Sequence, residues 1–318
     1  MAHMTNPLAT VDQLYQRSSS GALPSDLQDV VFFSTQTLTQ AAGLLLRLPQ
    51  SVTACANIVL ARYWLAESPM LYEFSDVSAA CIYLVAKLSS HPCPARDICN
   101  VYAYLMSPSS HLFRPAPADT KADADPSTYY LSDTAYTTRQ TQILKIESRV
   151  LYCLAFDTHV ALPHPLAVTY LQALDFLGQP GDKNAISSAA CAYLNTALLS
   201  PQLVYLTHQP NALAVAAIYN AARDLGARMP DCAWWEVFDV DREELGFLVV
   251  AMRSVSSWVT RQREEFQGLF ESGMVTREFV EGEMAKRGLK RVGNGSNQAA
   301  PEMDEETAMM MRMDAMPA

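Results

Sequence analysis

An internal repeat is the feature of this sequence that most restricts its fold. Residues 54–87 align without a gap with residues 190–223; both segments begin with Ala-Cys-Ala and carry an Ile-Tyr pair near their ends. Small residues such as Ala let neighbouring helices approach closely, which a bundle around a buried central helix requires. A repeated unit of this kind predicts two similar helical bundles in tandem.

Apolar residues recur at helical spacing on both sides of the repeated segments. The first predicted series of helices covers residues 30–48, 50–66, 76–88, 95–106 and 136–154, and the second covers 163–177, 184–199, 210–225, 230–238 and 241–266. Pro49 separates the first two helices. Ser75 and Asp241 are predicted to cap the helices that follow them. The expected fold class is all-α, with two tandem five-helix domains.

The domain boundaries follow from changes in composition along the 318 residues. The first domain is predicted at residues 28–157 and the second at 158–266. Residues 1–27 are polar and begin with what looks like a cloning remnant, so we expect a flexible, mostly extended lead-in. Residues 107–130 are rich in Pro, Ser, Asp and Ala, which indicates a flexible insertion. Residues 267–318 are expected to be charged and amphipathic at first and then disordered.

Charge and cysteine usage exclude several classes of function. The formal net charge is −10, whereas proteins that bind nucleic acid usually present a basic surface, so no direct nucleic-acid partner is expected. Seven cysteines without a CxxC motif indicate reduced thiols in a cytosolic or nuclear protein. We see no signal peptide and no apolar run long enough to span a bilayer, so no membrane association is expected.

The residues that enzymes need are not present in recognisable patterns. The sequence has no kinase motifs and no P-loop. His159 and His164 are separated by Pro163 and do not share a helical face, so they do not predict a metal site. We therefore expect no catalytic residues, no cofactor and no metal site. The pair Trp234-Trp235 is interpreted as a core anchor of the second domain, with a binding hot spot as the alternative.

Three stretches of the sequence resemble the cyclin box. QAAGLLLRLPQSVTACANIVLARYWL (40–65) is similar to the first two helices of a cyclin box, and its LLRLPQ and Arg62-Tyr63 resemble cyclins of the L type. FSDVSAACIYLVAKLSSHPCPARDICNVYAYL (74–105) resembles the third and fourth helices, including the Ala86-Lys87 ending of the central helix. QILKIESRVLYCLAFDTHVALPHPLAVTYLQAL (142–174) resembles the fifth helix and the start of a second box. The resemblance covers about residues 28–260 and implies a double-box cyclin.

The resemblance also implies a site. In cyclins, a Lys on the third helix and a Glu on the fifth help to dock the C-helix of a kinase; these positions correspond to Lys87 and Glu147. A docked C-helix is held where its Glu pairs with the catalytic Lys of the kinase. The residues predicted to bind the kinase are Lys87, Glu147, Val77, Tyr83, Leu84, Leu88, Ile143 and Leu151.

The sequence departs from the cyclin pattern in three respects. Ser89-Ser90 occupy the place where many cyclins have an acidic pair after the central Lys. Residues 40–48 do not match the patch with which cell-cycle cyclins dock substrates, so no docking of substrate motifs is predicted. The Arg/Ser-rich tail of L-type cyclins is not found in this sequence.

The function implied by the resemblance is that of a non-catalytic subunit which binds and activates a cyclin-dependent kinase through the first box. The L-type features imply the transcription and splicing branch, a PITSLRE-type kinase, a nuclear location and contacts with splicing or transcription factors. One alternative is a transcription-elongation cyclin of the T or K type. Another is a cyclin-fold scaffold, or an adaptor similar to a transcription factor, that binds peptides or DNA.

Overall fold

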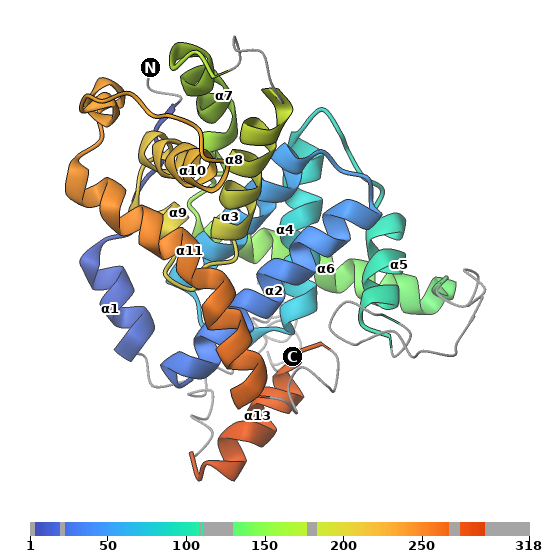
Figure 1. The fold of residues 1–318 in the computed structure, drawn as a ribbon. Helices are drawn as coiled ribbons and strands as arrows, with labels where there is room; N and C mark the ends of the chain where they lie inside the picture. Colours follow the sequence, from blue (N-terminus) through green and yellow to red (C-terminus); the bar gives the residue numbers. More distant parts are fainter. Residues whose placement is uncertain are drawn as a thin grey trace, which may run out of the picture. The chain divides into compact units, whose positions relative to one another are not determined.

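The computed structural model shows an all-helical protein, as the sequence predicts (Figure 1). It describes residues 4–19, 23–107, 110, 130–176, 183–266 and 274–289. Within these residues, no helix has both the length and the apolar character needed to cross a membrane. Residues 1–280 form one compact unit, and residues 281–318 form a second one.

The first helical series surrounds one central helix. It consists of α2 (Ser25–Leu45), α3 (Gln50–Ala66), the short 3-10 helix η2 (Pro69–Leu71), α4 (Phe74–Leu88), α5 (Ala95–Leu105) and α6 (Asp133–Cys153). Helix α4 packs against α2, α3, α5 and α6. Its small residues Ala79, Ala80 and Ala86 are fully buried, which lets the four neighbours come close.

The second helical series repeats this arrangement. It consists of α7 (Pro163–Ala173), α8 (Lys183–Ala197), α9 (Val204–Thr207), α10 (Pro210–Asp224), η4 (Trp234–Phe238) and α11 (Arg242–Glu265). Helix α10 is central here, and it packs against α7, α8 and α11. The two central helices are the ends of the aligned segments 54–87 and 190–223, so the sequence repeat marks equivalent positions in the two series. The division into two domains at residues 157 and 158 stays a prediction.

The N-terminal segment differs from the expected extended lead-in. Residues Val11–Ser19 form helix α1, which contacts α3. Ahead of it, Asn6 is buried, and its amide donates to the carbonyl of Ala161 while its Oδ1 accepts from the Ala161 N–H, both at 2.8 Å. Gln209 exchanges hydrogen bonds with the backbone of Asn6. The segment is ordered because these bonds satisfy its buried polar groups.

One predicted helix cap is wrong, and the other has the predicted position without the capping bond. Ser75 lies inside α4, whose N-cap position is held by Glu73. The helix starts earlier because Phe74 is buried, with its ring 6.2 Å from that of Trp64 in an edge-on contact. Asp241 occupies the N-cap position of α11, but its side chain makes no capping hydrogen bond.

Other predictions concern short or undescribed segments. The helix predicted at 230–238 is only the 3-10 helix η4, where Trp234 is buried as a core anchor and Trp235 is half-buried. The predicted insertion at 107–130 lies almost wholly outside the described residues, and so does the tail beyond residue 289. Helix α13 (Arg277–Lys286) runs from the end of the first compact unit into the second.

Candidate functional site

Helices α4 and α6 bring the two predicted charged residues together. Lys87 lies in the last turn of α4, where the helix macrodipole favours a cation, and its ammonium pairs with Oε1 of Glu147 on α6. The Lys87 side chain is 49% exposed and that of Glu147 is 6% exposed. The Lys87 ammonium also lies 5.2 Å from the ring centre of Tyr83, one turn earlier on α4. The arrangement fixes one cation at the surface between two helices.

The burial of Glu147 makes this ion pair structurally important as well. A buried carboxylate is costly unless a partner compensates for the lost hydration. Lys87 provides that compensation from the solvent side. Loss of Lys87 would therefore leave a buried charge unpaired and would also remove the cation from the surface.

Two further ion pairs fix helix α6 against its neighbours. Arg139 lies 3.5 Å from Asp76 in the first turn of α4, and Arg149 pairs with Glu67 at the end of α3. Burial raises the pKa of Asp76, and the Arg139 charge and hydrogen bond oppose that rise. Helix α6 is thus held along its length, so the groups on its outer side keep a fixed geometry.

Three of the predicted contact residues are not at the surface. Val77, Leu84 and Ile143 are fully buried in the first helical series. The reason is that α4 is surrounded by four helices, so most of its side chains face protein. They are core residues that lie beneath the candidate surface, so the prediction that they contact the kinase directly is wrong. Leu88 is 60% exposed and Leu151 is partly exposed, as contact residues must be.

The structure adds exposed apolar residues that the sequence reasoning missed. Leu144 is exposed on α6, Tyr152 is 77% exposed, and Phe156 beyond the helix end is 65% exposed. The rings of Tyr152 and Phe156 lie 6.1 Å apart. Spacing in multiples of four residues places Leu144 and Tyr152 on one side of the helix, and this signal was available in the sequence. Phe156 was not predictable in this way, because Ala155 and Phe156 both have left-handed backbone angles.

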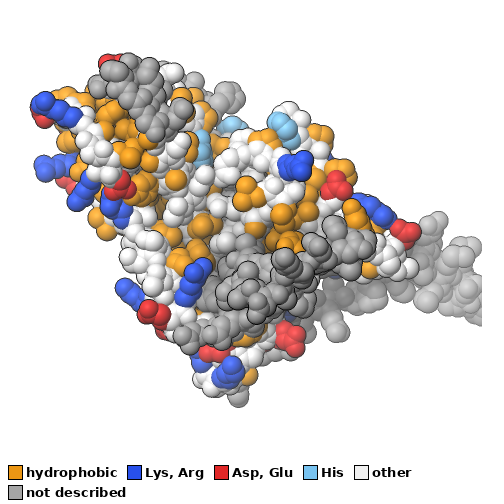
Figure 2. Space-filling view, turned by 45° about the vertical axis from the view of Figure 1, so that its right-hand side comes forward, with side chains coloured by type: hydrophobic (Ala, Val, Ile, Leu, Met, Phe, Trp, Pro, Cys, Tyr) orange, Lys and Arg blue, Asp and Glu red, His pale blue; other side chains and the backbone are white. Residues whose placement is uncertain are grey.

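We call this set of residues the α4–α6 face. It consists of Tyr83, Lys87, Leu88, Leu144, Glu147, Leu151, Tyr152 and Phe156. A view from the side that includes α5 and α6 shows apolar side chains exposed in several places, with charged ones mostly toward the edges (Figure 2). Exposed aromatic and aliphatic groups around a fixed charge are typical of a surface that binds another protein.

The described residues give no support to metal chemistry. No group of three or more His, Cys, Asp or Glu side chains among them could hold a metal ion. His164 is half-buried, and its Nε2 lies 2.9 Å from Oδ1 of Asn195, so its role is structural. Burial lowers the pKa of His164.

Two solved structures share the fold of this chain. A chain of the yeast RNA Pol II CTD kinase CTDK-1 complex aligns with a TM-score of 0.59 and 12% identity, over 89% of this chain and 84% of that one. A chain of the CAK complex of Chaetomium thermophilum bound to ATP-gamma-S aligns with a TM-score of 0.57 and 15% identity, over 92% and 94%. At such identities the comparison concerns the fold, which is that of the cyclin boxes.

Curated relatives then identify the family. Cyclin-L2 of Homo sapiens is 31% identical over 245 residues, which are 76% of this chain and 43% of the relative. Cyclin-L1 of Gallus gallus is 32% identical over 233 residues, which are 72% and 39%. No family model matches the chain. The chain belongs to the cyclin family and is similar to cyclin L, and it spans about two fifths of the length of these relatives.

Proposed function

We propose that this chain is a regulatory subunit which binds and activates a cyclin-dependent kinase through the α4–α6 face. The observation that supports this most is the Lys87–Glu147 pair, which joins α4 to α6 next to Tyr83 and is followed along α4 by the exposed Leu88. The chain itself carries out no catalysis in this proposal, as its cyclin relatives imply.

The proposed mechanism is selection of one kinase conformation. A kinase needs its C-helix turned inward, so that a Glu on that helix reaches the catalytic Lys. A partner surface that fits only the inward position stabilises that conformer at the expense of the other. The α4–α6 face suits this role because Arg139, Glu147 and Arg149 tie α6 to its neighbours. A surface that did not hold its shape would favour the two conformers more equally.

The proposed type of partner kinase and the proposed location follow from the similarity to cyclin L. Similarity to cyclin L supports a kinase of the transcription and pre-mRNA-splicing branch, of PITSLRE type, and a nuclear location. Contacts with splicing or transcription factors belong to the same proposal, as does the division into a first cyclin box at 28–157 and a second at 158–266. A membrane or a direct nucleic-acid partner is not part of it.

The first test is an affinity pull-down of this chain from nuclear extract, read by mass spectrometry. We expect one cyclin-dependent kinase in stoichiometric amount, and its identity tests the PITSLRE assignment. Recovery of another cyclin-dependent kinase would overturn only that assignment and would favour the alternative of an elongation cyclin. Recovery of promoter factors or splicing proteins without a kinase would overturn the proposal in favour of the adaptor.

A second test locates the surface. Leu88→Arg places a large charged group on the α4–α6 face, at an exposed helix end where a cation is tolerated. Val250→Arg is the matched control, because Val250 is similarly exposed but lies on α11. Lys87→Glu is the direct variant, and a thermal unfolding curve shows whether it still folds.

We expect Leu88→Arg and Lys87→Glu to reduce kinase binding and activation by about tenfold or more, which corresponds to about 1.4 kcal/mol. Val250→Arg should bind and activate as the unaltered chain does. Equal binding by Leu88→Arg and Val250→Arg would show that the kinase docks elsewhere, even if the partner is the expected one.

A further inference from the structure

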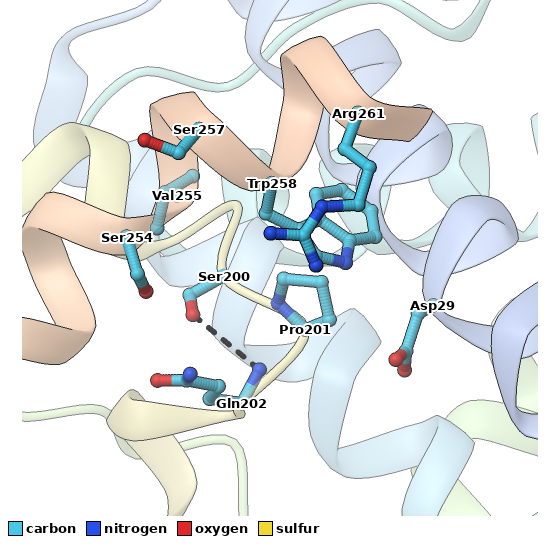
Figure 3. A pocket seen from close by; sticks show the side chains of 9 residues that line it. All are labelled: Asp29, Ser200, Pro201, Gln202, Ser254, Val255, Ser257, Trp258 and Arg261. Carbon is cyan, nitrogen blue, oxygen red and sulfur yellow. Dashed lines mark hydrogen bonds between the residues drawn. The ribbon is translucent and has the colours of Figure 1, made fainter. Parts of the chain in front are cut away.

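A pocket of about 470 Å³ lies between elements of both helical series. Asp29 of α2 lies on one side of it, and Trp258 and Arg261 of α11 lie on another, with Pro201 between them (Figure 3). The turn after α8 contributes Ser200 together with Pro201. None of these residues belongs to the α4–α6 face, so the pocket is a separate site on the chain.

The pocket has a fixed apolar lining. Val255 is buried on α11, and Trp258 packs edge-on against Phe33 of α2, with ring centres 5.5 Å apart. Pro201 completes the apolar part. A volume within the range of roughly 300–1,000 Å³ and an aromatic wall are typical of sites that bind ligands. The indole is held in place before any ligand arrives, so binding does not have to order it.

The pocket carries an acidic side chain, Asp29, on one side and a basic side chain, Arg261, on the other. Asp29 is half-buried, and its carboxylate has Arg17 of α1 at 3.5 Å as its ion-pair partner. Arg261 is exposed, and within the described part of the chain it has no ion pair or hydrogen bond. The pocket therefore presents a carboxylate on the α2 side and an uncompensated guanidinium on the α11 side.

The length of the pocket along α11 limits the size of a ligand. Lining residues run from Ser254 through Trp258 to Arg261, at helical spacings of four and three. Seven residues of helix rise about 10 Å, and an extended peptide covers that length in roughly three residues. A short extended peptide matches both this length and the mixed charge.

We propose that this pocket binds an extended peptide segment in which one apolar residue is flanked by a basic and an acidic residue. The apolar residue packs on Trp258 and Pro201, the basic residue faces Asp29, and the acidic residue pairs with Arg261. Opposite charges at the two sides favour such a segment over a uniformly acidic or uniformly basic one. The chain could then hold a second partner while the α4–α6 face is occupied.

The test uses the full chain and a panel of short fluorescein-labelled peptides. In each peptide a Lys and a Glu flank a central Leu at different spacings, and binding is measured by fluorescence anisotropy. Two double-mutant cycles follow. The first combines Asp29→Asn with replacement of the peptide Lys by Ala. The second combines Arg261→Ala with replacement of the peptide Glu by Ala. Arg263→Ala is the matched control, because Arg263 is exposed on α11 but does not line the pocket.

We expect saturable binding of at least one peptide, and a loss of affinity of about threefold to fivefold for each single change, as for a half-exposed ion pair. The second change in each cycle should add little to the first. The proposal is overturned if no peptide binds saturably, or if Arg261→Ala and Arg263→Ala have equal effects. Because the assay contains no kinase, its failure would leave the proposed function standing, and failure of the pull-down would not affect the peptide result.

Discussion

At the scale of single residues, Gly43 shows how closely the first two helices of the bundle approach. A Cβ atom added at Gly43 would lie 2.2 Å from Oγ1 of the buried Thr53 on α3. We predict that Gly43→Ala lowers the free energy of unfolding by about 1–3 kcal/mol, because Thr53 or the helix must shift. Denaturant titration followed by circular dichroism measures this change.

Gly246 on α11 provides the matched control for that substitution. A Cβ atom there would meet nothing within 4 Å. Gly246→Ala should therefore raise the free energy of unfolding by about 0.5–1 kcal/mol through helix propensity alone. If both variants shifted stability in the same direction, the contact between Gly43 and Thr53 would not be as close as described.

Asp29 gives a prediction about pH. Burial raises the pKa of Asp29 from 3.8 to about 6; the charge of Arg17 on α1 lowers it, and Asp26 on the same helix raises it. Arg261 of α11 faces the same pocket. Because the folded-state pKa lies above the unfolded one, the folded form binds the proton more tightly. The stability that this group contributes is present below about pH 4 and is lost as the pH rises to about 6.

Asp29→Asn removes this titration. We expect the variant to lose less stability than the unaltered chain between about pH 4 and pH 6. The measurement is a series of denaturant titrations across that range, with the exposed Asp12→Asn as the control. Identical pH profiles for the chain and Asp29→Asn would contradict the assigned environment.

The sequence was sufficient to predict which charged side chains of the candidate site lie close together, whereas their role in kinase binding stays a prediction. Lys87, Tyr83 and Glu147 come together as the resemblance implied. Val77 and Ile143 were assigned to the surface wrongly, because a helical period gives the direction of a side chain but not which neighbouring helices cover it.

At the scale of elements, the end of α6 shows an unusual choice of residue. The Phe156 N–H donates to the carbonyl of Leu151 at 2.8 Å, and the Ala155 N–H donates to the carbonyl of Tyr152 at 3.1 Å. These two bonds form a Schellman motif, in which Ala155 has the left-handed conformation. Glycine is preferred there, since any Cβ makes this conformation less favourable. Arg47 after α2 and Asp175 after α7, the first helices of the two series, adopt the same conformation.

We therefore predict that Ala155→Gly raises the free energy of unfolding by about 0.5–1 kcal/mol. Ser148→Gly, in the middle of the same helix, should lower it by about 0.5 kcal/mol. Thermal or denaturant unfolding of both variants is the measurement. A loss of stability in Ala155→Gly as large as that in Ser148→Gly would argue against the left-handed end.

Long helices were predictable and short ones were not. The second helix was predicted at 50–66 and α3 has those bounds. The four-residue helix α9 was missed, because so short a helix carries no periodic signal of its own. It is stabilised by tertiary contacts: Val204 and Leu206 are buried, and the Tyr205 hydroxyl donates to the carbonyl of Leu194 at 3.0 Å.

At the scale of the whole molecule, the N-terminal segment joins the two helical series. Asn6 binds the connector at Ala161, and its Oδ1 also accepts a hydrogen bond from Arg62 of α3 at 3.2 Å. We predict that Asn6→Ala lowers the free energy of unfolding by about 1–3 kcal/mol, because it leaves buried backbone groups without partners. Denaturant titration gives the value.

Asn6→Asp is the informative comparison. Aspartate keeps the oxygen that accepts from Ala161 and Arg62, but it cannot donate to the Ala161 carbonyl. We expect its effect to be smaller than that of Asn6→Ala. Equal stability of the unaltered chain and both variants would show that the segment is not part of the folded unit.

Arg62 affects how the two helical series can move relative to each other. Its guanidinium donates to the carbonyl of His159 at 2.7 Å and also to Oδ1 of Asn6. A single side chain therefore binds both the connector before α7 and the N-terminal segment. Motion of one helical series against the other must break these charge-assisted bonds together. Helix α3 of the first series is therefore coupled to the start of the second series through one side chain as well as through the chain itself.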